Sequence, residues 1–351
     1  MQIVTFERRR AGARGPGSMR AAVLGFETLE PVRHGARRLG ALLSSGTHAN
    51  LVVDLNRALA VKLATEDVGA PEAEADSLLP ADALHFARHF PYALDEARRA
   101  LDFALQSLDR YDAPDLVAAG IAAPRQEIRL CAPLPNPGKI IGVARNYAAH
   151  GAERGSREPP EEPVLFLKAP SAVIGPEDEI VVPAAVAQPD YEGELAVVIG
   201  RRARRAAPED ALACVAGYCA ANDVSARDFQ GVRGQHFLGK SCDSFAPLGP
   251  ALVTPDEIPD PQDLGIRTSL SGEIVQAGHT KDMIFSVAQI IAFASRLMTL
   301  EPGDVILTGT PAGVGAARTP PRWLRDGDVV EVEIERLGRL ANHVRSEQPR
   351  T

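Results

Sequence analysis

The sequence predicts an α+β protein that is mainly β, with a small α+β domain followed by a larger domain rich in strands. Gly (30) and Pro (28) together make 58 of the 351 residues and follow no repeat, which is typical of short strands joined by tight turns. Apolar runs of strand length recur along the chain, whereas only two stretches carry a clear helical repeat. The length suits a large domain with a smaller companion.

The composition favours a soluble cytoplasmic protein with no nucleic-acid or membrane partner. The formal net charge is −8 at pH 7, and an acidic chain is poorly suited to bind phosphate backbones. The longest nearly apolar stretch, residues 211–221, is shorter than a bilayer span, and the first residues lack the apolar core of a signal peptide. The four cysteines show neither metal nor redox spacing, which fits reduced thiols in a cytoplasm.

Residues 1–130 are expected to form the small domain. Strands at 2–6 and 20–26 flank an arginine-rich loop, which we interpret as a solvated hairpin loop rather than a nucleic-acid arm because its setting is acidic. A further strand is expected at 51–55. From Leu94 apolar residues recur at steps of three and four, which predicts an amphipathic helix that ends before the next proline.

Residues 131–138 hold three prolines within six positions and are expected to be a stiff connector to a catalytic domain at 139–351. One amphipathic helix is expected there at 286–298. The expected strands of this domain are 139–144, 164–167, 179–182, 192–199, 216–221, 251–254, 266–270, 305–307 and 329–334.

Two glutamates near the start of a predicted core strand are the first candidates for chemistry. Glu192 and Glu194 belong to the run 190–200, whose apolar end predicts a strand. Side chains two residues apart on a strand share a face, about 7 Å from each other. Such carboxylates repel one another and lose hydration unless a cation or basic groups neutralise them. The alternative is a solvent-exposed strand end.

A third carboxylate, Asp223, ends another short apolar strand and precedes the polar turn 225–228. If the two strands meet, three oxygen ligands converge, and this arrangement suits a hard divalent cation. No His or Cys is placed to join them, so Mg²⁺ or Mn²⁺ is preferred over Zn²⁺, while Ca²⁺ usually takes more protein oxygens. The spacing leaves open whether the strands meet.

His150 and Glu153 lie three residues apart in a polar segment that follows a predicted strand. On a helical turn residues at this spacing are neighbours, so the carboxylate could orient the imidazole and raise its basicity. The pair would then be a general base for water. The alternative is a surface histidine with an incidental glutamate nearby.

Two further segments place polar groups among small residues. Lys240 is either an exposed turn lysine or a cation that stabilises a developing enolate. The Gly-rich segment 307–315 lacks the lysine of a phosphate-binding loop and the full dinucleotide-binding pattern. We interpret it as a hairpin loop whose backbone and Thr310 can approach a ligand closely.

These segments, in this order, resemble the fumarylacetoacetate hydrolase family over roughly three fifths of the chain, from about Pro137 to Val344. Each segment alone is a weak signal, whereas the ordered set is specific. The N-terminal region resembles the variable domain that many members carry. The matching segments are 142–150, 162–168, 191–195, 222–230, 238–241, 283–286, 302–315 and 326–330.

The resemblance implies a mixed β-roll or sandwich in the C-terminal domain and assembly as a homodimer. Glu192, Glu194 and Asp223 match the family's Mg²⁺ or Mn²⁺ ligands. His150 and Glu153 match its water-activating pair, which lies on a lid.

The resemblance also implies substrate contacts. Lys240, Arg227 and Gln230 match residues that hold or polarise the substrate, and Thr310 matches a loop position that contacts it. The segment before the lid reads Arg-Asn, where the eukaryotic fumarylacetoacetases supply an additional Asp ligand. The chain therefore resembles the three-carboxylate branch, which includes acylpyruvate hydrolases and related bacterial catabolic enzymes.

The function implied is a metal-dependent hydrolase that cleaves a C–C bond in a small anionic 2,4-dioxo acid of aromatic catabolism, such as an acylpyruvate or a fumarylacetoacetate- or fumarylpyruvate-like compound. His150 would take a proton from water, and Lys240 would help to hold the enolate released. The alternative is a 2-oxo acid decarboxylase, or a hydratase or isomerase, on the same scaffold. A metal-stabilised binding protein is a third reading, in which His150, Glu153 and Lys240 would be unnecessary.

Overall fold

The computed structural model divides the chain into two compact units, Met1–Cys131 and Ala132–Thr351. Their boundary falls at the start of the proline-rich segment 131–138. The strand expected at 20–26 lies outside the described residues. Within the described part of the chain, no helix combines the length and the apolar character needed to cross a membrane. The described residues are 1–9, 35–155, 158–231 and 235–348.

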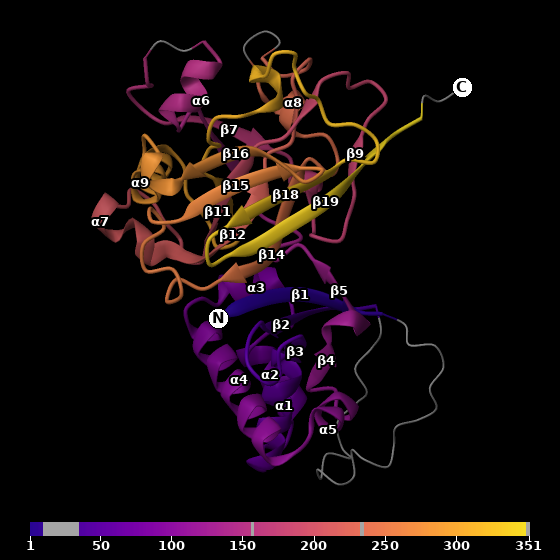
Figure 1. The fold of residues 1–351 in the computed structure, drawn as a ribbon. Coiled ribbons are helices and arrows are strands. Elements are labelled where there is room, and N and C mark those ends of the chain that lie inside the picture. The colour runs from indigo at the N-terminus through magenta and orange to yellow at the C-terminus, as the bar shows by residue number, and fades with distance from the viewer. Residues whose placement is uncertain (10–34, 156–157, 232–234, 349–351) are drawn as a thin grey trace. The chain divides into compact units, whose positions relative to one another are not determined.

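The N-terminal unit holds an antiparallel sheet and a group of helices (Figure 1). The strands pair in the order β4-β3-β2-β1-β5. They are β1 (Gln2–Arg8), β2 (Arg37–Leu43), β3 (Leu51–Asp54), β4 (Ala122–Pro124) and β5 (Ile128–Cys131). The helices are α1 (Leu55–Thr65), α2 (Pro71–Leu78), α3 (Ala83–Arg88), α4 (Tyr92–Arg110) and α5 (Ala113–Ala118).

The helix expected from Leu94 is confirmed as α4, which buries Leu94, Ala97, Ala104 and Leu108 on one face. The strand expected at 51–55 is β3, and α1 follows it directly. Helix α1 escaped prediction because it contacts β2 as well as α2 and α4 and is buried on nearly all sides. A helix without a solvated face has little amphipathic repeat for a sequence pattern to reveal.

The C-terminal unit is built on two sheets. The larger is mixed: β17 and β6 run parallel, whereas the pairs β14–β12, β12–β11, β11–β17 and β6–β7 run antiparallel. Its spatial order is β14 (Ala246–Val253), β12 (Val215–Asn222), β11 (Gly193–Ile199), β17 (Val305–Leu307), β6 (Ile140–Ala144) and β7 (Val164–Lys168). The short strand β8 (Val173–Ile174) pairs with β14.

The second sheet of this unit has the order β16 (Glu273–His279), β15 (Gly265–Leu270), β18 (Val329–Ile334), β19 (Gly338–Ser346) and β9 (Ile180–Val182). A separate two-stranded ladder joins β10 (Pro189–Asp190) to β13 (Ser225–Ala226). The helices are α6 (Ala148–Glu153), α7 (Pro208–Ala211), α8 (Phe237–Lys240) and α9 (Val287–Leu297).

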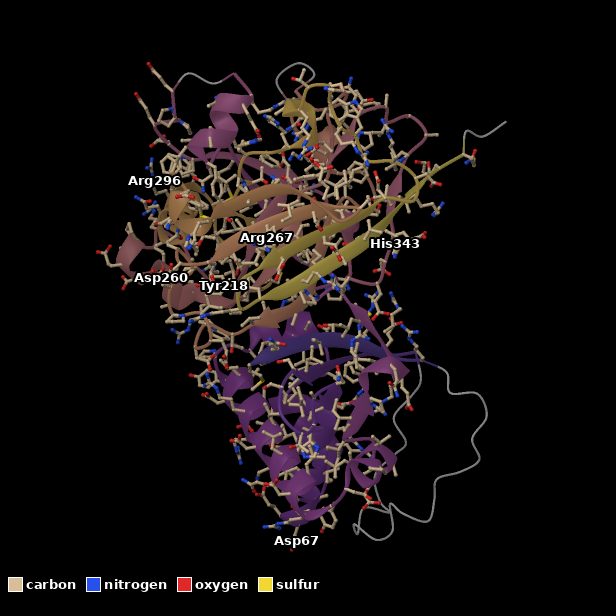
Figure 2. The ribbon with its side chains drawn as sticks, viewed as in Figure 1. Asp67, Tyr218, Asp260, Arg267, Arg296 and His343 are labelled. Atoms are coloured by element: carbon tan, nitrogen blue, oxygen red, sulfur yellow. The ribbon has the colours of Figure 1, made fainter. Side chains whose placement is uncertain are left out.

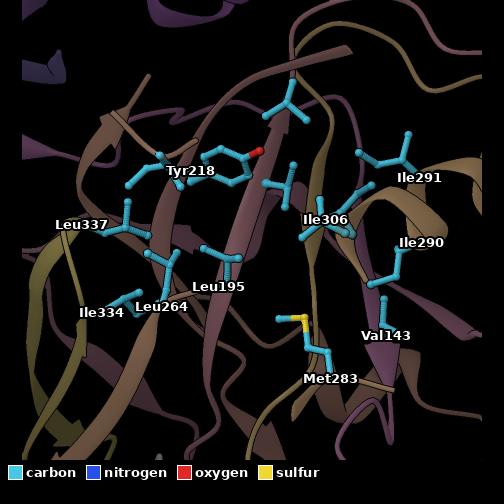
Figure 3. Packing of buried hydrophobic residues seen from close by; sticks show 14 of the residues in the cluster. Val143, Leu195, Tyr218, Leu264, Met283, Ile290, Ile291, Ile306, Ile334 and Leu337 are labelled. Atoms are coloured by element: carbon cyan, nitrogen blue, oxygen red, sulfur yellow. The ribbon is translucent and has the colours of Figure 1, made fainter. Parts of the chain in front are cut away.

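The two sheets and α9 enclose the larger of two buried hydrophobic clusters in this unit (Figure 3). Leu195 of β11 and Ile334 of β18 belong to it, as does Ile290 of α9, and all three are at most 1% exposed. Burying each such side chain contributes about 1.5–3 kcal/mol. The mixed β-sandwich expected for this domain is thus present, and α9, with a Ser286–Gln289 capping box, is the helix expected at 286–298.

Gly193 shows how closely the two sheets approach beside the candidate site. A Cβ on Gly193 would lie 2.1 Å from Thr268 Oγ1 of β15, so no larger residue fits between the layers. The Gly193 amide donates to Gln276 Oε1 of β16 at 2.9 Å. This contact ties the start of β11 to the second sheet.

Two strands of the second sheet, β16 and β19, were not predicted. In β19 the inward positions are Leu340, Asn342 and Val344. The buried Asn342 donates to the carbonyls of Gly175 and Asp178, each at 2.9 Å. A polar residue at a core position interrupts the alternation by which strands are recognised.

Candidate active site

The register of β11 and β12 brings three carboxylates together. Gly193 pairs with Asn222, so Glu192 and Asp223 are opposite one another just beyond the ladder, and the Asp223 amide donates to the Glu192 carbonyl at 2.8 Å. Glu194 shares the face of Glu192. The three side chains offer carboxylate oxygens within 4.8 Å of one another. The strands therefore meet, which the spacing had left open.

These carboxylates are buried rather than at a solvent-exposed strand end: Glu192 is 5% exposed, Glu194 2% and Asp223 1%. Buried carboxylates require compensation by cations or hydrogen bonds. Among the described residues, no other group of three or more Asp, Glu, Cys or His side chains is spaced closely enough to hold a metal ion.

Lys240 lies between two of the three carboxylates. Its Nζ donates to Glu192 Oε2 and to Asp223 Oδ2, each at 2.6 Å. The side chain is 2% exposed, so the alternative of an exposed turn lysine is wrong. Burial lowers the pKa of Lys240, but the carboxylates of Asp223 and Glu192 outweigh burial, so that this pKa lies above its ordinary value.

Arg227 holds the outer oxygen of Glu192. Its Nη2 is 2.7 Å from Glu192 Oε1, and its Nε donates to Asp190 Oδ2 at 2.9 Å. The Asp190 carboxylate is in turn fixed by the amide of Gly315 at 2.7 Å. Burial raises the pKa of Glu192, but Lys240 and Arg227 outweigh it, so that this pKa lies below its ordinary value.

A second buried lysine, Lys168 at the end of β7, completes the ionic cluster. Its Nζ donates to Asp223 Oδ1 at 2.5 Å and to the Val224 carbonyl at 3.2 Å. Burial, reinforced by Lys240, lowers the pKa of Lys168, and Asp223 opposes this effect. Sequence reasoning assigned Lys168 no role, although it ends one of the segments that carry the family resemblance.

Among the described residues, Glu194 is the carboxylate of the triad that forms no ion pair with a Lys or Arg side chain. Its Oε2 accepts a hydrogen bond from the Gly309 amide at 2.6 Å. Burial and the neighbouring carboxylates of Asp223 and Glu192 raise the pKa of Glu194 well above its usual range. A cation placed among the three carboxylates would relieve this repulsion.

Helix α6 presents the candidate base to the same region. His150 Nδ1 lies 2.9 Å from Glu153 Oε1, and Glu153 Oε2 accepts from the Gly313 amide at 2.8 Å. An ionised carboxylate only accepts hydrogen bonds, so Nδ1 carries the proton and Nε2 of a neutral His150 carries the lone pair. The imidazole is thereby set up to take a proton.

Asn146 fixes the chain where α6 begins. Its Nδ2 donates to the Thr308 carbonyl at 2.7 Å, and its Oδ1 accepts from the Phe285 amide at 2.8 Å. The residue is fully buried in this structural role. In this chain, Asn146 lies in the segment that the resemblance matches to an additional Asp ligand of the eukaryotic fumarylacetoacetases. Its side chain instead holds the backbone of Thr308 and Phe285 in place.

A cavity of about 380 Å³ connects the base to the carboxylates. Glu192, Glu194, Lys240 and His150 line it. Asp223 and Glu153 lie behind this surface and act on it through their contacts with Lys240 and His150. Further lining side chains include Arg145, Arg154, Phe166, Arg227, Gln230, His236 and Thr310.

Thr310 and Gln230, both expected to contact substrate, line this cavity but are engaged within the protein. The Thr310 hydroxyl donates to the Gly193 carbonyl at 2.9 Å and accepts from Gln276 Nε2 at 2.7 Å. Gln230 Oε1 accepts from Arg227 Nη1 at 2.7 Å. Because the Thr310 hydroxyl donates its proton to the Gly193 carbonyl, it has no second proton to donate to a substrate.

Phe166 and His236 are cavity residues that sequence reasoning missed. Their ring centroids are 5.6 Å apart, and Lys240 Nζ lies 5.1 Å from the Phe166 centroid. Phe166 reads as an ordinary strand residue, and His236 belongs to no motif with a known spacing. Only the fold brings them to the cavity.

A buried carboxylate triad and an oriented histidine that share one cavity on a β-sandwich define the class of the protein: an enzyme built around an acidic site. The chain belongs to the fumarylacetoacetate hydrolase family, because residues 139–345 match the family model described as Fumarylacetoacetate (FAA) hydrolase C-terminal.

Curated relatives share more of the chain than this domain. The chain is 44% identical over 271 residues to "Oxaloacetate tautomerase FAHD2A, mitochondrial" of Homo sapiens, covering 77% of this chain and 81% of the relative. It is 46% identical over 221 residues to "Oxaloacetate tautomerase YisK" of Bacillus subtilis (strain 168), covering 62% of this chain and 73% of the relative.

Solved structures carry names of different reactions. The 2-hydroxyhepta-2,4-diene-1,7-dioate isomerase from Mycobacterium marinum is similar with a TM-score of 0.57 and 40% identity, covering 65% of this chain and 82% of that one. The fumarylacetoacetate hydrolase from Exiguobacterium antarcticum is similar with a TM-score of 0.68 and 33% identity, covering 98% of this chain and 100% of that one.

The donor set fits a divalent cation of the hard class. Three carboxylates offer only oxygen, which suits Mg²⁺ or Mn²⁺. With Asp190, four carboxylates face three cations, Lys168, Lys240 and Arg227, which leaves one formal negative charge on the cluster. A bound dication would turn that charge positive and favour an anionic substrate.

Proposed function

We propose that the protein is a metal-dependent tautomerase of 2-oxo acids, with oxaloacetate as its substrate. The names of the human and Bacillus subtilis relatives support this proposal. The observation that carries it is the contact of His150 Nδ1 with Glu153, which leaves a proton-accepting Nε2 beside the carboxylate triad. Keto–enol interconversion needs such a base and a means of stabilising negative charge on the carbonyl oxygen.

In this proposal His150 moves the proton. Its Nε2 takes a proton from the carbon next to the carbonyl group, and the resulting imidazolium returns it to the oxygen. No atom is gained or lost, so one residue suffices for both transfers. Glu153 holds the ring in the required tautomer and stabilises the imidazolium.

Lys240 stabilises the negative charge that develops on the oxygen. An ammonium group has three donors, and two of those of Lys240 are directed to Glu192 and Asp223. The third is available to a substrate oxygen. Because the two carboxylates fix the position of Nζ, this donor needs little reorganisation during the reaction.

The cofactor proposed is Mg²⁺ or Mn²⁺, held by Glu192, Glu194 and Asp223. A divalent cation supplies Lewis acidity, which lowers the cost of forming an enolate from a 2-oxo acid. The structure supports this through the burial and convergence of the three carboxylates.

The second candidate is the hydrolase implied by the sequence resemblance, acting on a C–C bond of an acylpyruvate-like 2,4-dioxo acid. The name of the Exiguobacterium antarcticum structure and its coverage of nearly the whole chain favour it. In that reaction His150 Nε2 would take its proton from water rather than from carbon. The remaining residues would keep the roles given above.

One experiment separates the candidates. The protein is assayed with Mg²⁺ and with EDTA on freshly dissolved oxaloacetate, and the decay of the enol absorbance is followed while the products are identified. We expect faster keto–enol equilibration with Mg²⁺ and no net product. Release of two acids from an acylpyruvate without accelerated enol decay would favour the hydrolase, and release of CO₂ would favour a decarboxylase.

Assembly as a homodimer and a cytoplasmic location stay predictions of the sequence. The human relative carries the word mitochondrial in its name, which applies to that protein. Light scattering of the purified chain tests the dimer directly.

A further inference from the structure

His236 is a cavity residue with no role in the chemistry described above. It stands at the start of α8, and its side chain makes no capping hydrogen bond to that helix. Its Nδ1 lies 3.2 Å from Gln230 Nε2, and its ring packs against Phe166. Two neighbours therefore hold the imidazole at the cavity wall.

A chain of hydrogen bonds fixes which nitrogen of His236 carries the proton. Arg227 is a pure donor, so the Gln230 atom 2.7 Å from Arg227 Nη1 must be the amide oxygen. The amide nitrogen of Gln230 then faces His236 as a donor, and Nδ1 of His236 must accept. In the neutral ring the proton consequently belongs to Nε2.

The two histidines of the cavity are thus set in opposite ways. His150 donates a hydrogen bond from Nδ1 to Glu153 and keeps a lone pair on Nε2, whereas His236 accepts at Nδ1 and keeps a proton on Nε2. Burial and the nearby Lys240 lower the pKa of His236, which favours this neutral form. One imidazole takes protons, and the other offers a hydrogen bond.

No acceptor for His236 Nε2 is found among the described residues. The side chain lines the 380 Å³ cavity, as do Arg145 and Arg154. A donor of this kind, in a cavity with arginines in its wall, suits a negatively charged oxygen.

The position of His236 relative to Lys240 indicates how far that oxygen lies from the triad. The two residues are four positions apart along α8, which corresponds to about 6 Å of helical rise. Lys240 contacts Glu192 and Asp223 directly, so His236 stands about one helical turn farther out. If a four-carbon diacid binds at the triad by one end, its other carboxylate lies about as far from the triad as His236 does.

We propose that His236, as a neutral hydrogen-bond donor, binds the distal carboxylate of a 2-oxo dicarboxylic acid and so makes the cavity selective for dicarboxylates over monocarboxylates. This inference rests on the proposed function, because it takes the cavity as the site of a 2-oxo acid. His236 binds the substrate without transferring a proton, so no atom balance changes.

The test uses two ligands that cannot tautomerise. Malate and 2-hydroxybutanoate share the chelating end and differ in a distal carboxylate or methyl group. Their affinities for the full-length protein saturated with Mg²⁺ are measured by calorimetry. We expect the wild type to prefer malate, and His236→Phe, which keeps the ring contact with Phe166, to weaken malate binding about tenfold or more while leaving 2-hydroxybutanoate unchanged.

Rescue distinguishes a donor from a ring that only fills space. His236→Gln can place an amide N–H near the position of Nε2, so it should recover most of the affinity for malate. The side chain in His236→Asn is too short to reach that position, so this variant should bind the two ligands as the Phe variant does. It replaces the Phe variant in the test if the Phe variant does not fold. The exposed His343 on β19 (Figure 2) provides a control, and His343→Phe should change neither affinity.

Equal weakening of both ligands in His236→Phe, unchanged binding of both, or failure of the Gln variant to recover malate binding would overturn the proposal. These measurements do not depend on turnover. A protein that prefers malate through His236 but does not accelerate oxaloacetate tautomerisation would contradict the proposed function and leave the dicarboxylate site in place.

Discussion

Lys168 donates a hydrogen bond to Asp223 with 2.5 Å between Nζ and Oδ1, and both side chains are at most 1% exposed. Removing one partner of such a pair leaves an unpaired buried charge, which costs about 3–5 kcal/mol. We therefore expect Lys168→Met to lower the free energy of unfolding of the C-terminal unit by about that amount. Added Mg²⁺ should restore part of the loss, because a cation near Asp223 replaces the missing charge.

The measurement is urea unfolding followed by the fluorescence of Trp323, the single tryptophan of the chain, which lies in this unit. Lys281→Met is the matched control, since Lys281 is exposed, and it should change stability by less than about 0.5 kcal/mol. Equal stabilities for the two variants would show that the buried contact contributes nothing.

Glu194→Gln should abolish stabilisation by the metal. A cation at 100 times its dissociation constant stabilises a folded protein by about 2.7 kcal/mol, and the variant lacks one of the three carboxylates. Thermal unfolding with Mg²⁺ and with EDTA measures the difference. Glu333→Gln changes an exposed glutamate of β18 and should keep the full effect of Mg²⁺, and a Glu194 variant that did the same would remove Glu194 from the site.

His150→Gln should lower turnover by about 10²-fold or more, the usual contribution of a general base, while Mg²⁺ still raises the melting temperature. Glu153→Gln should give a smaller loss, because the base remains but its orientation and tautomer are less well fixed. Steady-state rates on oxaloacetate measure both effects. Unchanged rates in His150→Gln would mean that the proton is moved by another group.

Metal affinity should fall as the pH is lowered. Burial and the neighbouring Asp223 and Glu192 raise the pKa of Glu194 well above the ordinary 4.5, so a proton competes with the cation at pH values above 4.5. Lowering the pH protonates Glu194 and weakens the site, whereas raising it strengthens the site. Calorimetric titration with Mg²⁺ over a pH series measures this affinity. A Mg²⁺ affinity that does not change between neutral pH and pH 4.5 would contradict the prediction.

Gly313→Ala should reduce both stability and turnover. Gly313 has φ of +112°, and a Cβ there would lie 2.1 Å from the Val275 carbonyl oxygen, while its amide holds Glu153. Gly272 also has positive φ, at +87°, but a Cβ would meet nothing within 4 Å. Gly272→Ala should therefore cost only about 1–2 kcal/mol and leave the rate unchanged, and equal effects of the two variants would refute the steric argument.

The core of the site could be predicted because strand geometry and charge are local properties. Glu192 and Glu194 are two residues apart, which fixes their common face, and their place at the entry to an apolar strand indicates burial. His150 and Glu153 are one helical turn apart, and their ring nitrogen and carboxylate oxygen are 2.9 Å apart. In each case the spacing carries the geometry.

The rest of the site depends on pairings between distant segments. Lys168 at the end of β7 reaches Asp223, which follows β12, although three strands lie between β7 and β12 in the sheet order. The sequence around neither residue reveals this contact. His236 is recognised only once Gln230 and Phe166 are seen beside it. Two elements escaped prediction for local reasons: burial removes the amphipathic repeat of α1, and the buried Asn342 interrupts the alternation of β19.

The loop between β17 and Gly315 contributes two amides to the site: Gly309 holds Glu194, and Gly313 holds Glu153. The five residues 309–313 thereby set the spacing between the acidic triad and the proton carrier. Phe166 and His236, in contrast, come from β7 and from the start of α8. The selectivity residues are thus encoded apart from the loop that holds Glu194 and Glu153, although His236 shares α8 with Lys240. Substitutions at Phe166 and His236 can therefore change which acid is accepted while Glu194 and Glu153 stay in place. This separation is consistent with the different reactions that appear in the names of similar proteins.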